Sequence, residues 1–122
     1  MQKPLQGKKI LVVEDEAIIG MYTEDTLVDA GALVLGPVAT LKEAFAVLDT
    51  ARDLDAVALD LNLNGDSSGP LADALAEREL PFIMLTGYDT KGIPEGHRDR
   101  PLVGKPYNSK HLVEAFVDLL KP

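Results

Sequence analysis

Short apolar runs alternate with segments of helical periodicity along the whole of this 122-residue chain. Several of the runs are rich in β-branched residues, which favour buried strands. The runs occupy residues 10–13, 33–35, 55–61, 81–85 and 102–103. Strands that alternate with helices predict βαβ units, in which helices cover both faces of a parallel sheet. We therefore expect an α/β fold.

The segments between the runs carry helix signals. The apolar face of a first helix is predicted to consist of Ile18, Ile19, Tyr22, Leu27 and Ala30, and Gly31 is well placed to end that helix. Thr40 and Glu43 form a capping box at the start of a second helix. Residues 64–70 have the composition of a loop, and a third helix begins at about Leu71.

A last helix is predicted to start near Asn108 or Ser109. It has two apolar rows, and the second would be either additional core or a surface for a partner. This second row consists of Val113, Val117 and Leu120.

Composition excludes several classes of protein. The net charge of −8 argues against nucleic-acid binding, which needs clustered lysine and arginine. The absence of cysteine excludes disulfides and thiolate metal sites. No apolar run is long enough to span a membrane, and the first has no signal-peptide pattern. We expect one cytoplasmic domain over residues 1–122, with no output domain.

Polar residues follow the predicted strands at their carboxyl ends, where open α/β sheets bind ligands. Glu14 and Asp15 follow the first strand, and Asp60 stands at the end of the third. Thr86 follows the fourth strand and Lys105 the fifth. Three acids, a hydroxyl and an amine should therefore meet at one edge of the sheet.

These residue types suit phosphoryl transfer around a magnesium ion. Mg²⁺ prefers one or two carboxylates, here Asp15 and Asp60, and the backbone carbonyl of Asn62 could add a further oxygen. Asp60 is the best candidate nucleophile, because carboxylates form aspartyl-phosphate intermediates. Lys105 can neutralise a phosphoryl group, and Thr86 can donate a hydrogen bond to it.

The motifs "VVEDE", "LDLNL", "LTG" and "GKP", in this order, resemble the receiver domain of two-component response regulators. The resemblance covers nearly the whole chain and implies the flavodoxin-like strand order 2-1-3-4-5. It implies a magnesium site and a phosphorylated aspartate. The implied residues are Glu14, Asp15, Asp60 and the carbonyl of Asn62 as metal ligands, Asp60 as phospho-acceptor, and Thr86 and Lys105 as its partners.

The stretch "PFIMLTGYD" is similar to the signature of the FAT GUY receivers, which are known mainly from alphaproteobacteria and often act with kinases of the HWE class. Those receivers lack the usual aromatic switch residue, and Leu102 stands at that position here. We therefore expect switching and control of hydrolysis to involve Tyr88, Leu102 and Pro106. The fourth helix should be short or disordered, because residues 89–100 are rich in glycine and proline.

Individual residues also fit simpler structural roles. Asp15 and Glu16 could cap the first helix, since acids favour helix N-termini. The stretch "GDSSG" at residues 65–69 has no supporting serine-protease arrangement and indicates a flexible polar loop. His97 and His111 are isolated in sequence, which favours surface positions over metal binding.

The sequence favours a phosphorylation-switched signalling module over an enzyme. Its donor would be a sensor histidine kinase or a histidine phosphotransfer protein, and its output a downstream protein target. The alternatives are a haloacid-dehalogenase-like phosphohydrolase and a pseudo-receiver that binds partners without phosphorylation.

Overall fold

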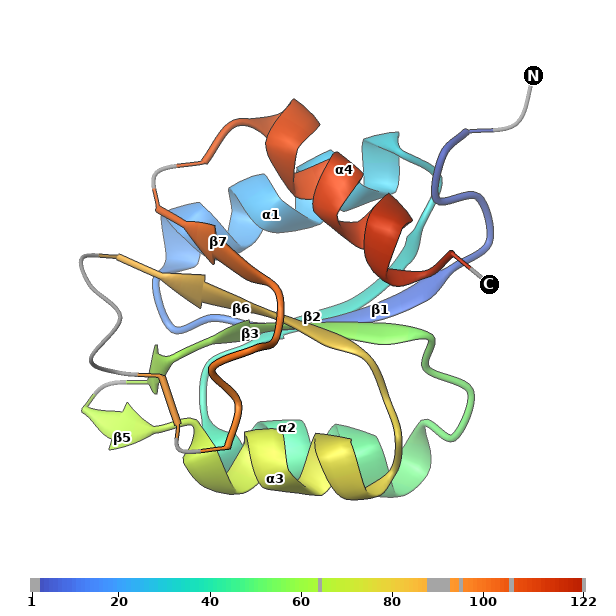
Figure 1. Cartoon of the computed structure of the whole chain (residues 1–122). Helices are drawn as coiled ribbons and strands as arrows, with labels where there is room; N and C mark the ends of the chain where they lie inside the picture. The colour runs from blue at the N-terminus through green and yellow to red at the C-terminus, as the bar shows by residue number, and fades with distance from the viewer. Residues whose placement is uncertain (1–2, 64, 88–92, 95, 106, 122) are drawn as a thin grey trace.

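The computed structural model describes residues 3–63, 65–87, 93–94, 96–105 and 107–121. One sheet contains β1 (Lys9–Val13), β2 (Leu33–Val38), β3 (Ala56–Asp60), β6 (Phe82–Thr86) and β7 (Leu102–Gly104). Its strands are all parallel and lie in the order β2-β1-β3-β6-β7 (Figure 1). This is the order 2-1-3-4-5 of a flavodoxin-like sheet, so the predicted α/β class and topology are confirmed.

Helices cover both faces of the sheet. They are α1 (Ala17–Asp29), α2 (Leu41–Thr50), α3 (Gly69–Glu77) and α4 (Ser109–Leu119). Figure 1 shows α1 and α4 on one face and α2 and α3 on the other. Between β6 and β7 the described residues form turns and no helix, as expected for this stretch. Tyr88 and its neighbours up to residue 92 lie outside the described residues.

Two hydrophobic cores follow from the alternation of side chains along the strands. In β1, Ile10 and Val12 belong to the core under α1 and α4, whereas Leu11 and Val13 belong to the core over α2 and α3. All four side chains are fully buried. Burial on both faces of the sheet explains why residues 10–13 of β1 are continuously apolar.

The predicted caps are present. The hydroxyl oxygen of Thr40 accepts a hydrogen bond from the N–H of Glu43 at 3.1 Å and donates to the Glu43 carboxylate, also at 3.1 Å. Asn108 caps α4 through a bond from the N–H of His111 to its side-chain oxygen at 2.7 Å. Both helices therefore begin where the sequence predicted.

The predicted face of α1 is wrong in part. Leu27 is buried as expected, but Ile18 is 83% exposed and Tyr22 is 41% exposed. The helix instead turns smaller residues inward, including Gly20 and Thr23. A Cβ atom at Gly20 would lie 3.1 Å from the side chain of Pro37 in β2. Close packing against this proline therefore fixes the rotation of α1.

The second apolar row of α4 belongs to the core. Its three residues, Val113, Val117 and Leu120, are partly buried and pack against the cluster under α1 and α4. Of the two interpretations left open by the sequence, additional core is the one that the packing supports.

The stretch expected to be a flexible polar loop, residues 65–69, supplies one strand of a short antiparallel hairpin. Its strands are β4 (Asn62–Leu63) and β5 (Asp66–Ser67). The following residue, Ser68, is fully buried. The expectation was wrong because polar composition does not reveal hydrogen bonds that a folded backbone offers to a small hydroxyl residue.

His111 is exposed as predicted, but the surface position predicted for His97 is wrong, because this residue is only 5% exposed. Its Nε2 lies 2.8 Å from a carboxylate oxygen of Asp73 in α3, and Nε of Arg100 donates to its Nδ1 at 2.9 Å. Its ring also meets Phe82 edge-on, with centroids 5.8 Å apart. His97 therefore anchors the turns before β7 to α3 and β6.

Within the described residues, no helix combines the length and the apolar character that crossing a membrane requires.

Replacing His97 with alanine should lower the free energy of unfolding by about 2–3 kcal/mol, because it removes two hydrogen bonds and leaves a cavity beside Phe82. Urea denaturation would measure the change. The matched control is His111→Ala, an exposed site where the change should stay within about 0.5 kcal/mol. Equal effects at the two histidines would contradict the anchor.

Candidate functional site

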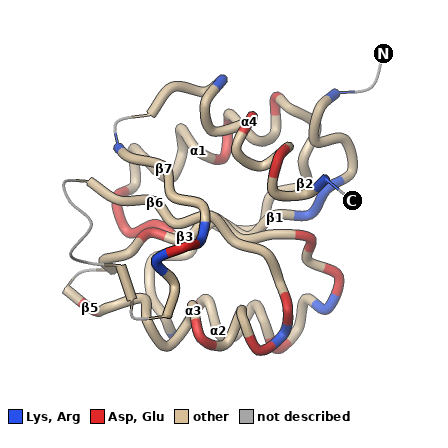
Figure 2. The backbone as a smooth tube through the Cα atoms, in the orientation of Figure 1, with Lys and Arg blue, Asp and Glu red and all other residues tan. Residues whose placement is uncertain are grey.

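Three carboxylates converge at the carboxyl ends of β1 and β3. Val13 pairs with Leu59 in these neighbouring strands, so the residues that follow, Glu14 and Asp60, lie side by side. Oxygen atoms of Glu14, Asp15 and Asp60 lie within 4.8 Å of one another. Figure 2 shows the acidic stretch where the chain passes from β1 to α1. The sheet register therefore creates a cluster of negative charge.

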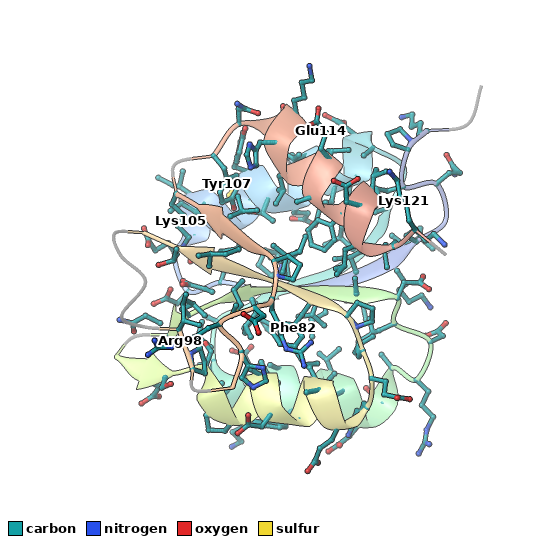
Figure 3. The ribbon with its side chains drawn as sticks, viewed as in Figure 1. Phe82, Arg98, Lys105, Tyr107, Glu114 and Lys121 are labelled. Carbon is teal, nitrogen blue, oxygen red and sulfur yellow. The ribbon has the colours of Figure 1, made fainter. Side chains whose placement is uncertain are left out.

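Lys105 enters this cluster from the end of β7 (Figure 3). Its backbone N–H donates to the carbonyl of Thr86 at 2.6 Å, which fixes the lysine beside the end of β6. Its Nζ lies 2.8 Å from Oε2 of Glu14 and 3.2 Å from Oδ2 of Asp60. The lysine side chain is only 10% exposed, so this ion cluster is largely shielded from water.

Asp60 is held at several atoms. Its Oδ1 accepts a hydrogen bond from the N–H of Asn62 at 3.2 Å, while Oδ2 faces Lys105. Its backbone carbonyl accepts a hydrogen bond from the hydroxyl of Ser68. These contacts restrict both the carboxylate and the backbone that carries it.

Ser68 is a site residue that sequence reasoning missed. It stands at the N-cap of α3, where serine is common, but its side chain makes no capping hydrogen bond. The hydroxyl is used on Asp60 instead, and the Ser68 N–H donates to the carbonyl of Leu61 at 3.3 Å. The sequence does not reveal the bond from Ser68 to Asp60, because a serine before a helix is equally expected to cap that helix.

The burial of Glu14 dominates the electrostatics. Burial, reinforced by the neighbouring Asp60, raises the pKa of Glu14 to about 7, although Lys105 acts in the opposite direction. Burial alone would lower the pKa of Lys105, but its acidic neighbours Glu14 and Asp60 outweigh this and raise it. Lys105 therefore remains charged, while Glu14 binds a proton more readily than an ordinary carboxyl group.

The arrangement suits a divalent cation. Oε2 of Glu14 is buried, and Nζ of Lys105 lies 2.8 Å from it as an ion-pair partner. No well-aligned donor reaches that oxygen from elsewhere in the part of the chain that the structure describes. Adjacent carboxylates repel each other, and hard oxygen ligands of this kind are those that Mg²⁺ prefers. Glu14, Asp15 and Asp60 could together hold such an ion.

The remaining predicted site residues that the structure describes lie in β4, β6 and β7. Asn62 lies in β4, where its side-chain oxygen accepts from Gly65 at 2.7 Å; its carbonyl as a metal ligand stays a prediction. Thr86 ends β6, one residue beyond Leu85, which pairs with Asp60. Leu102 packs against the core over α2 and α3. Tyr88 and Pro106 lie outside the described residues.

Of the two acids that could cap α1, Glu16 does not do so through its side chain. Glu16 occupies the N-cap position, but its side chain makes no capping hydrogen bond. The N–H of Glu16 instead donates to Oε1 of Glu14 at 3.2 Å. The backbone of Glu16 therefore helps to orient the carboxylate of Glu14.

Comparison with solved structures finds close matches over nearly the whole chain. SdrG from Sphingomonas melonis Fr1 is 37% identical with a TM-score of 0.83, and the match covers 94% of this chain and 98% of SdrG. A response regulator receiver protein from Sinorhizobium medicae WSM419 is 28% identical with a TM-score of 0.83, covering 95% and 96% of the two chains.

Sequence comparison finds a more distant relative. The transcriptional regulatory protein PdtaR from Mycobacterium tuberculosis is 24% identical over 113 residues, which are 89% of this chain and 55% of PdtaR. The chain therefore spans little more than half of that relative. No family model matches the sequence.

The raised pKa of Glu14 predicts a stability that falls with pH in metal-free buffer. The folded protein holds this proton more tightly than the unfolded chain, so its free energy of unfolding should fall between pH 4.5 and about 7. The shift limits the loss to about 3 kcal/mol. Urea titrations in EDTA should show this loss in the wild type.

The loss should largely disappear in Glu14→Gln, which cannot titrate, and persist in Glu16→Gln, where the replaced acid is 62% exposed. Parallel pH profiles for wild type and Glu14→Gln would show that the titrating group is elsewhere.

Proposed function

Because this chain belongs to the response regulator receiver family, we propose that it is a signalling switch whose Asp60 accepts a phosphoryl group from a phosphohistidine. The observation that carries the proposal is the ion cluster, in which Lys105 reaches both Glu14 and Asp60 within 3.2 Å. A positive side chain beside a restrained aspartate and two further acids is the set that phosphoryl transfer to a carboxylate needs.

In the proposed reaction, an oxygen of Asp60 attacks phosphorus and forms an acyl phosphate. The phosphorus–nitrogen bond of the donor breaks, and the imidazole leaves with that electron pair and takes up a proton. Lys105 would exchange part of its contact with Oδ2 of Asp60 for the incoming phosphoryl oxygens. Thr86 would donate its hydroxyl hydrogen to another of these oxygens.

A bound Mg²⁺ would supply charge neutralisation for the phosphoryl oxygens. Glu14, Asp15 and Asp60 would hold it, with the carbonyl of Asn62 as a further ligand. The Asn62 N–H would keep the Asp60 carboxylate oriented through the bond to Oδ1. Ser68 would keep the strand end in place during the change of charge.

The exposed side of α1 is the proposed docking surface for the phosphodonor. Ile18 is 83% exposed and Met21 60% exposed, and the two lie one helical turn apart. Beside them is a cavity of about 500 Å³, lined by Glu16, Ile18, Ile19, Tyr22, Gly87, Lys105 and Tyr107. An apolar surface that leads to the lysine suits a helical histidine kinase or phosphotransfer protein, for which the HWE class is our expectation.

Two alternatives predict different behaviour with acetyl phosphate and magnesium. A haloacid-dehalogenase-like phosphohydrolase would turn the phosphodonor over rapidly, and its nucleophile would follow the first strand, whereas Asp60 ends β3. A pseudo-receiver would form no adduct. Intact mass spectrometry distinguishes both from the proposed switch, which accumulates one phosphoryl group per chain.

Replacing Asp60 with asparagine should abolish labelling by acetyl phosphate and Mg²⁺, because the nucleophilic oxygen is lost while the fold is kept. Intact mass would show whether one phosphoryl group is added. Asp66→Asn is the matched control, since Asp66 is an exposed acid in the neighbouring hairpin. Labelling that survives Asp60→Asn would overturn the acceptor assignment.

Replacing Ile18 with glutamate should slow phosphotransfer from a cognate phosphohistidine protein about tenfold or more, because an interfacial apolar contact becomes a buried charge. The rate with acetyl phosphate, which needs no docking, should stay near that of the wild type. Val28→Glu is the control, because Val28 is 47% exposed near the far end of the same helix. Equal slowing by both substitutions would exclude a specific docking surface.

A further inference from the structure

Tyr107, two residues after Lys105 along the chain, contacts helix α1. Figure 3 shows it between the start of α4 and α1. Its hydroxyl forms a hydrogen bond with Oγ1 of Thr23, which is fully buried. Its ring lies 5.9 Å from that of Tyr22, and it lines the cavity that Lys105 also lines. Tyr107 therefore connects the neighbourhood of Lys105 to α1.

Each of the two hydroxyl groups has only one hydrogen to donate. The single hydroxyl hydrogen of Thr23 has an acceptor in the carbonyl of Ile19, 2.8 Å away. With the Thr23 hydrogen used on that carbonyl, the Thr23 oxygen is left as an acceptor, and Tyr107 can donate its own hydrogen to it. Burial raises the pKa of the Tyr107 phenol, so it keeps that hydrogen at neutral pH.

From this geometry we infer that Tyr107 is a positioning residue for Lys105, an inference that rests on the proposed phosphoryl transfer. The backbone of Lys105 is fixed beside β6 by the bond from its N–H to the carbonyl of Thr86 at 2.6 Å. The hydrogen bond between Tyr107 and Thr23 holds Tyr107, two residues further along the chain, against α1. The ion pairs with Glu14 and Asp60 hold the ammonium, and a restrained backbone limits the positions that the flexible four-carbon stem can take around them.

Ring packing alone does not account for the hydroxyl. The Tyr107 ring is partly buried against the core under α1 and α4, and phenylalanine would fill the same space. A buried hydroxyl is tolerated only with a partner, and α1 supplies one through a threonine that faces inward. In this inference, the hydroxyl of Tyr107 holds the chain that follows β7 at a fixed distance from α1.

Positioning and general stabilisation predict different kinetics. Lys105 assists phosphoryl transfer, but it also competes with a cation for the same carboxylates. Loosening the lysine should therefore slow phosphorylation without weakening Mg²⁺ binding. General damage to the site would weaken both.

The test is Tyr107→Phe, with the phosphorylation rate measured by intact mass with acetyl phosphate at saturating Mg²⁺, and Mg²⁺ affinity measured by calorimetry. We expect a rate about three- to tenfold lower, the effect of losing one hydrogen bond, and an unchanged or tighter Kd for Mg²⁺. Thr23→Val should give the same defect, and the double variant should be no slower than either single one.

The matched control is Thr50→Val, because the Thr50 hydroxyl makes a similar bond within α2, on the opposite face of the sheet, to the carbonyl of Ala46 at 3.2 Å. A Tyr107→Phe rate equal to wild type, or a parallel loss of Mg²⁺ affinity, would overturn the positioning role. Failure of the wild type to become labelled would instead overturn the proposed phosphoryl transfer on which that role rests.

Discussion

The shielded contact of Lys105 with Glu14 and Asp60 is the interaction on which the rest of the site depends. Buried like charges are unfavourable, and a single cation between them makes their burial tolerable. The sheet supplies the acids through the register of β1 and β3, and it supplies the lysine through the pairing of β6 with β7. The resting site is therefore neutralised in part by its own chain, and an added cation would compete for oxygens already in use.

Most of the architecture could be predicted from the sequence because it depends on local patterns. Apolar runs such as residues 10–13 mark strands buried on both faces, and parallel strands place their carboxyl ends at one edge. The acidic cluster follows from that rule alone, and the four motifs at the strand ends indicated the family correctly. The capping box at Thr40 is equally local, since both partners lie within one helical turn.

The errors have one origin, which is tertiary packing. Periodicity assigns Ile18 to the core, yet Gly20 packs against Pro37 and turns the isoleucine outward. An isolated histidine such as His97 is expected at the surface, yet Asp73 and Arg100 provide it with buried partners. Ser68 likewise bonds to the strand carbonyl that the fold brings near it. The decisive partners, Pro37 for Gly20 and Asp73 for His97, lie 17 and 24 residues away along the chain, outside a local window of sequence.

Pro37 has a consequence beyond fixing the rotation of α1. β2 lies at one edge of the sheet, and an edge strand normally offers a row of N–H groups that another chain can pair with. Proline has no N–H, and the pairing of β2 with β1 shifts register between Leu11 and Val13, next to this proline. This edge is consequently a poor template for the addition of another strand. An edge of this kind disfavours edge-to-edge aggregation between molecules of the protein.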